Sequence, residues 1–191
     1  MARFLTSVLI VLIVIAAIAG TVVYTGFYNI GADAPHSRVV YSLLEELRDK
    51  SIASHARAIA VPSDLADTKR IAASAGLYDE MCTGCHLGPG LERTEISQGL
   101  YPPAPELGRG DDLSPAEQFW TIKHGVKLTA MPAWGKTHND ELIWDMVALV
   151  RQLPKMTPEK YKTTVASAPE SHEEMMEHEH GDAAAAHNHA H

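Results

Sequence analysis

The sequence predicts an all-α protein with four parts: an N-terminal transmembrane helix, a spacer helix, a small helical domain and a disordered tail. Apolar residues recur every three to five positions in residues 37–60 and form one face of a later helix, and polar capping residues stand where helices begin. No alternating strand pattern extends beyond a few residues. Of the 191 residues, 46% are hydrophobic and 21% are charged, as in ordinary globular proteins. We place the four parts at residues 1–32, 33–62, 63–163 and 164–191.

The first part predicts a membrane anchor. No residue between Arg3 and Asp33 carries a charge, and about 20 apolar residues cross a bilayer as a helix. A cleaved signal peptide is the alternative, because Ala17-Ile18-Ala19 is a small-x-small site behind an apolar region. We favour retention, since the apolar run continues to an aromatic cluster near Tyr28, as at membrane interfaces. With Arg3 in the cytoplasm, we expect a single-pass protein of a bacterial inner membrane with its domain in the periplasm.

Residues 37–60 predict the second helix, which we interpret as a spacer or packing helix. Apolar residues recur along it with charged residues between them. Val61-Pro62 is expected to end it, because the residue before a proline is pushed out of the helical region. His36 and His55 are expected at its surface, and nothing in this segment indicates chemistry.

Four more helices are predicted beyond Ser63. One covers 67–81 and leads into the cysteine pair. The next opens on the capping-box residues Ser114-Pro115-Ala116-Glu117 and ends at His124-Gly125. A third is capped by Asn139 or Asp140 and ends near Leu153, and a short fourth opens at Thr157-Pro158.

Only two cysteines occur, in the run Cys82-Thr83-Gly84-Cys85-His86. This pattern fits c-type haem attachment, in which both thiols bond to one haem and the histidine binds its iron. A thioredoxin-like pair needs a βαβ context, and a zinc site needs two further ligands at fixed spacing; the sequence offers neither. A structural disulfide does not account for His86. We therefore predict one covalent haem c, held by Cys82 and Cys85, with His86 as an axial iron ligand.

A six-coordinate haem iron needs a second axial ligand, and we expect Met131 to supply it. Met131 lies in the loop 127–135, where Pro132 stiffens the backbone directly after it. A methionine in a loop has fewer apolar contacts than one on a helix face, so Met131 is a better candidate than Met146. His124 is the rival, although the helix dipole alone favours a histidine at a helix C-terminus.

Three further segments carry a family resemblance: Gly76-Leu77-Tyr78 before the cysteine motif, Met131 to Gly135 after it, and Ile143-Trp144 in a later helix. With the motif they resemble a monohaem class I cytochrome c domain over roughly residues 63–153. The resemblance implies that the helix before the motif crosses the last helix, with Gly76 and Trp144 in that contact. Where the family often has glycine before the methionine ligand, this chain has Ala130.

The loop Tyr101-Pro102-Pro103-Ala104-Pro105 resembles the family segment that covers one haem edge, and a rigid surface turn is the alternative. Lys123, Lys127 and Lys136 lie near the ligand loop. They suit docking to an acidic redox partner, or are simply solvated.

Histidine and methionine at both axial positions leave the iron no open position for a substrate, and a thioether favours ferrous iron. We therefore expect a one-electron carrier and not an enzyme. It is expected to be tethered to the membrane and to pass electrons between respiratory or dehydrogenase partners. The net charge of -8 leaves no basic stripe for phosphates, so nucleic acid is excluded as a partner.

The last twenty residues hold six of the eleven histidines, interspersed with glutamate and alanine. This composition does not bury a core, so we expect disorder. Imidazole and carboxylate groups suit Zn, Cu or Ni, and the alternative is a merely solvating tail. The tail supports a second hypothesis, a metal-handling or metal/redox-sensing protein. Its candidate ligands are His178, His180, His187, His189 and His191.

Overall fold

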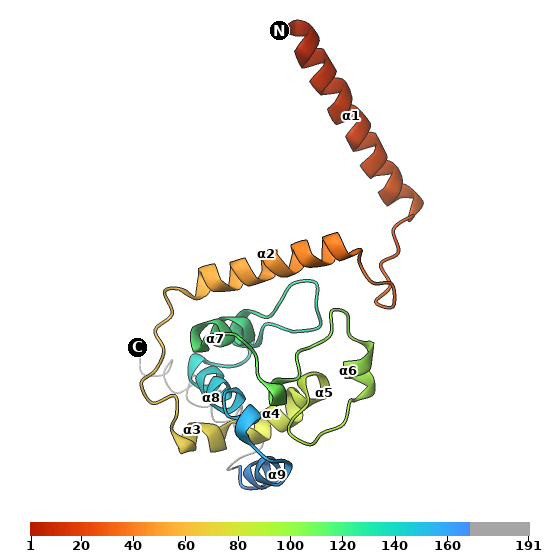
Figure 1. Ribbon diagram of the computed structural model, residues 1–191. Helices are drawn as coiled ribbons and strands as arrows, with labels where there is room; N and C mark the ends of the chain where they lie inside the picture. The colour runs from red at the N-terminus through yellow and green to blue at the C-terminus, as the bar shows by residue number, and fades with distance from the viewer. Residues whose placement is uncertain (169–191) are drawn as a thin grey trace, which may run out of the picture. The chain divides into compact units, whose positions relative to one another are not determined.

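The computed structural model describes residues 1–168 (Figure 1), and every regular element in that part of the chain is a helix. This confirms the all-α class. The chain divides into two compact units, one at residues 1–35 and one that begins at His36. The second unit holds both the expected spacer helix and the helices around the cysteine motif. Most of the expected tail, residues 169–191, lies outside the described residues.

The first unit is built around α1, Ala2–Thr25, which ends on Gly26 in a left-handed conformation with φ 63°. None of its residues is buried. With a mean hydropathy of 2.7, α1 is long and apolar enough to cross a membrane, judged by length and composition only. A signal sequence has the same properties.

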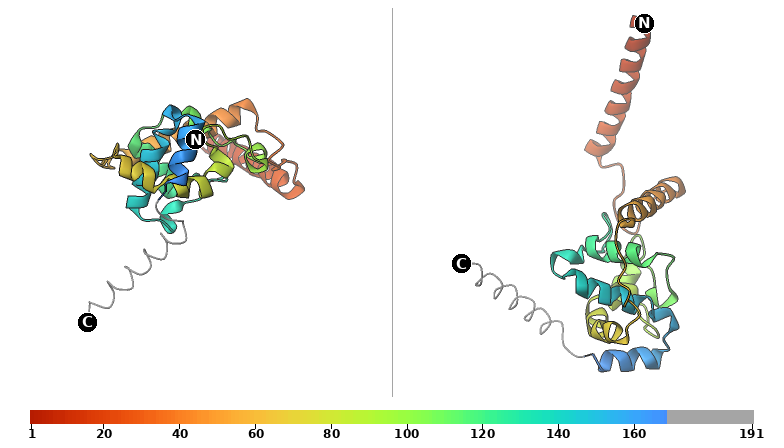
Figure 2. Two further views of the ribbon diagram at one scale, coloured as in Figure 1. Left: turned by 90° about the horizontal axis from the view of Figure 1, so that it is seen from below. Right: turned by 90° about the vertical axis from the view of Figure 1, so that its left-hand side faces the viewer.

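Helix α2, Arg38–Ala56, packs on α7, Pro115–His124, within the second unit (Figures 1 and 2). Ile52 and Ala56 are buried in this contact region. The helix ends four residues before the predicted limit of 60, because the chain turns to pack Ile59 against the apolar cluster around Phe119. Helix α2 is thus in contact with the helical domain, and its role as spacer or packing helix stays a prediction.

The single helix predicted over 67–81 is two helices, α3 at Thr68–Ala73 and α4 at Ala75–Met81. The break falls at Ser74, which is buried and donates its hydroxyl to the carbonyl oxygen of Asp145 at 2.9 Å. This contact ties the break to α8, Asp140–Val150. Both α3 and α4 pack on α8. A bond to a residue 71 positions away is not visible as a local sequence signal.

The other helices begin where capping residues were predicted. Ser114 accepts the backbone N–H of Glu117, and Asn139 accepts that of Leu142. Helix α9, Pro158–Ala166, runs three residues past the expected domain limit at 163, because Thr164 is buried against the domain. The shorter elements are α5 (Thr83–His86), α6 (Glu95–Gly99), η1 (Leu107–Arg109), η2 (Trp134–Lys136) and η3 (Leu153–Lys155).

The core lies between α4, α8 and α9, with a second apolar cluster where α7 meets α8. Tyr78 and Tyr161 meet edge to face in the first cluster, with ring centroids 6.4 Å apart. Phe119 and Trp144 stack in the second at 4.2 Å. Trp144 therefore packs on α7, while the crossing of α8 with the helices before the motif is made by α3 and α4.

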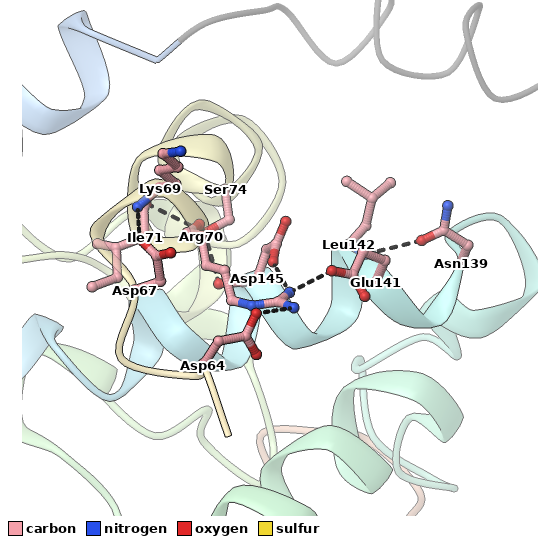
Figure 3. A network of polar contacts seen from close by, with 10 residues as sticks. All are labelled: Asp64, Asp67, Lys69, Arg70, Ile71, Ser74, Asn139, Glu141, Leu142 and Asp145. Carbon is pink, nitrogen blue, oxygen red and sulfur yellow. Dashed lines mark hydrogen bonds and ion pairs between the residues drawn. The ribbon is translucent and has the colours of Figure 1, made fainter. Parts of the chain in front are cut away.

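Arg70 on α3 links Asp64, which precedes α3, to Glu141 on α8, as Figure 3 shows. Its guanidinium contacts Asp64 at 2.9 Å and Glu141 at 2.7 Å, and it also pairs with Asp145. Burial raises the pKa of Asp145 although Arg70 opposes the rise. This ion pair therefore lies where desolvation is costly, and loss of one partner leaves the other poorly compensated.

We expect Arg70→Ala to lower the free energy of unfolding by about 2 kcal/mol. This is less than the roughly 3–5 kcal/mol for breaking a fully buried pair, because Asp64 and Glu141 are exposed. Urea unfolding of the holoprotein measures the change. Lys50→Ala is the control, since Lys50 and Glu46 form an exposed pair, and it should change stability by less than about 0.5 kcal/mol. Equal losses in both variants would contradict the role of the Arg70 network.

Candidate functional site

A cavity of about 430 Å³ opens in the second unit, within the range of roughly 300–1,000 Å³ typical of cofactor and ligand pockets. Its lining is mainly apolar and includes Cys82, Cys85, His86 and Met131. The structure thus brings all four residues expected around the cofactor to one cavity. Residues of α7, of the proline-rich loop and of the loop before Met131 also line it.

The two cysteines lie on one tight helical turn. The backbone N–H groups of Cys85 and His86 both donate to the carbonyl oxygen of Cys82, at 3.1 and 2.8 Å. Burial raises the pKa of the Cys82 thiol to about 12, and the neighbouring Cys85 adds to the rise. Such a free thiol stays protonated at neutral pH and is a poor nucleophile, which does not suit a redox-active pair.

Side-chain hydrogen bonds hold this turn in place from outside. The buried Tyr78 hydroxyl donates to the carbonyl oxygen of Leu87 at 2.6 Å, just beyond α5. Thr94 donates to the carbonyl oxygen of Gly84, and Thr83 donates back to that of Asp79. The protein's own side chains therefore hold the attachment turn at its middle, its start and its exit.

The His86 ring is oriented by the proline-rich loop. Its Nδ1 lies 2.9 Å from the carbonyl oxygen of Pro105, which can only accept, so Nδ1 is the donor. Nε2 is then left as the lone-pair nitrogen. Burial lowers the pKa of His86, although the Pro105 contact opposes this, and favours the neutral ring that binds metals. Metal-binding histidines commonly carry such a bond on their other nitrogen.

The loop that carries Met131 folds back on the end of α7. The Met131 carbonyl oxygen accepts from Val126 N–H at 3.3 Å, and the Met131 N–H donates to the Thr129 hydroxyl at 3.1 Å. Gly125 has φ +64°, and a Cβ there would lie 2.6 Å from the Pro132 carbonyl. Only glycine allows this approach without displacing the loop.

The rival ligand His124 is exposed and does not line the cavity. Its ring lies beside that of Trp120, with the two ring centroids 4.9 Å apart. Met146 does line the cavity, but it is buried on α8 as part of the apolar core. Among the expected docking lysines, Lys123 pairs with Asp140, while Lys127 and Lys136 are exposed. The patch is therefore less positive than its three lysines suggest.

Three residues of α2 also line the cavity: Arg48, Asp49 and Ile52. Sequence reasoning found no chemistry in this segment. Its periodicity predicts the helix, but a contact with a cavity formed by residues 78–150 is long-range and leaves no local signal. These are the functional candidates that the sequence missed.

The residues present fit haem c. Two thiols on one turn suit its two thioether bonds, an oriented imidazole and a thioether suit its iron, and the apolar walls suit its ring. The Thr121 hydroxyl on α7 is also buried at this cavity, with no hydrogen-bond partner among the described residues. A buried hydroxyl of this kind needs a partner, which a water molecule or a polar group in the cavity supplies.

The candidate tail ligands from His178 to His191 lie outside the described residues. Within residues 1–168, no group of three or more His, Cys, Asp or Glu side chains is placed to hold a metal ion.

Comparison with known proteins gives one match. The family model described as cytochrome c oxidase, cbb3-type, subunit III matches residues 69–150, somewhat less than half of the chain. No curated protein and no solved structure matches. The matched region runs from α3 to the end of α8 and includes the attachment turn and the Met131 loop. Residues 69–150 therefore form a c-type cytochrome domain, a family whose cofactor is covalently bound haem c.

Proposed function

We propose that this cytochrome is a membrane-tethered one-electron carrier with a single haem c, bound to Cys82 and Cys85 and axially ligated by His86 and Met131. The observation that carries the proposal is the shared cavity, which brings these four side chains together. The chain has no further cysteine for a second attachment site.

The chain's residues each contribute a separate part of this function. Pro105 holds the His86 ring with Nε2 free, and the Val126 and Thr129 contacts hold the Met131 loop. The mainly apolar lining suits the haem ring. A haem iron with both axial positions filled supplies reversible one-electron chemistry, and its thioether ligand raises the reduction potential.

Support for the location comes from α1, which is long and apolar enough to cross a membrane. We infer that it is retained as an anchor, with the haem domain on the outer side of a bacterial inner membrane, in the periplasm. A redox-protein donor and a redox-protein acceptor are then the partners. The name of the matching family, an oxidase subunit, favours a respiratory chain as the setting.

The axial ligand is tested by Met131→Ala. We expect the ferric protein to lose its weak far-red sulfur-to-iron absorption band, and its reduction potential to fall. Met146→Leu is the matched control, because it replaces the other cavity methionine with a side chain of similar size and should keep the band. Loss of the band in the control, with retention in Met131→Ala, would assign the ligand to α8.

The loop geometry is tested by Gly125→Ala. The added Cβ meets the Pro132 carbonyl at 2.6 Å, so the Met131 loop must shift and the far-red band should weaken. Cyanide should bind the variant more readily than the wild type. Gly99→Ala is the control, since no heavy atom lies within 4 Å of a Cβ at that position. Identical spectra and cyanide binding in both variants would show that the loop tolerates the side chain.

The anchor is tested by washing membranes that contain the protein with alkaline carbonate. We expect the haem protein to remain in the pellet, with Met1 or Ala2 at its N-terminus, because α1 spans the bilayer. Release into the supernatant with a mature N-terminus at Gly20 would establish the cleaved leader instead.

A further inference from the structure

Helix α2 lies outside the family match at residues 69–150, yet it forms part of the cavity wall. It packs on α7, whereas α5, which carries Cys85 and His86, packs on α4 and α6. Figure 1 shows α2 along the α7 side of the unit. The wall formed by α2 and α7 is therefore distinct from the wall that carries the attachment cysteines.

The chemistry of haem c makes this difference important. Its two thioether bonds form at one edge of the ring, and its two propionate carboxylates project from the opposite edge. If Cys82 and Cys85 hold the first edge, the carboxylates would face a wall of the cavity other than α5. Carboxylates that are partly removed from water need a cation or hydrogen-bond donors.

Arg48 is the one lysine or arginine that lines the cavity among the described residues. Its side chain is 37% exposed, so it lies at the mouth. Nε contacts Asp49 at 2.8 Å, while Nη2 lies 3.8 Å from Glu45, a long contact. A guanidinium has five N–H donors in a planar fork, so its Nη groups retain donors for another carboxylate.

Two further observations bear on this wall. Thr121 supplies the orphaned buried hydroxyl described above, on the helix against which α2 packs. The cavity is also lined by Asp49, Asp111 and Asp112. Two propionates add further negative charge to this acidic surface, which makes a single cation there electrostatically important.

We propose that α2 and α7 form the propionate-binding wall of the haem site, where Arg48 pairs with a propionate carboxylate and Thr121 donates a hydrogen bond to one. The inference rests on the proposed function, because it requires haem in this cavity. It gives α2 a role in setting the reduction potential. A cation near the haem favours the reduced state, which carries one more electron, so its removal lowers the potential.

The test uses the full-length holoprotein in detergent, with the reduction potential followed spectroscopically. Arg48→Gln should lower the potential several-fold more than Lys50→Gln does. The control removes the same charge from α2, but Lys50 does not line the cavity and its side chain is 78% exposed. Arg48→Lys should keep most of the potential, since it keeps the charge. Thr121→Val, which keeps the shape, should lower the potential without changing the axial ligands.

Resonance Raman spectra provide a second readout. The propionate bending bands should shift in Arg48→Gln and Thr121→Val, and stay unchanged in Lys50→Gln. Equal potential shifts in Arg48→Gln and Lys50→Gln, with unmoved propionate bands, would overturn the inference while leaving the haem site intact. If Arg48→Gln does not accumulate, unmoved bands in both Arg48→Lys and Thr121→Val overturn it equally. A wild-type protein without haem absorbance would contradict the proposed function itself.

Discussion

The hydrogen bond between the His86 ring and the Pro105 carbonyl is the interaction on which the site depends. It joins the attachment turn to a loop 19 residues further along the chain and fixes which ring nitrogen remains for a metal. Around it, Tyr78 holds the exit of the turn, and the Thr94 hydroxyl holds its middle. These contacts come from the protein itself and orient the imidazole that we propose as an axial iron ligand.

Because the His86 ring must keep this position, the helices that form the cavity must also be held in fixed positions. Helices α4 and α8 contribute Tyr78, Met146 and Val150 to the cavity wall, and these three residues also belong to the buried core. Arg70 forms an ion pair with Asp145 on α8, and Ser74 donates a hydrogen bond to the carbonyl oxygen of the same residue. These two contacts hold the segment that leads into the attachment turn. A shift of α3 along α8 would therefore move the cysteines relative to the rest of the cavity.

The sequence predicts the features whose causes are local. Ser114, Asn139 and Thr157 are capping residues next to the backbone groups that they satisfy, and the cysteine motif occupies a single turn. It does not predict the break at Ser74 or the turn after Ala56, because the partners that cause them are distant in the chain. For the same reason, Arg48 on α2 has no recognisable signal, although four expected cofactor residues are brought to the same cavity.

The mass of the haem-bearing peptide is the most direct test of covalent haem attachment at Cys82 and Cys85. After denaturation and acid-acetone extraction of the purified protein, proteolysis should release one peptide spanning Cys82 to His86 that carries one haem through both sulfur atoms. An unmodified peptide, with the haem recovered in the extract, would contradict it.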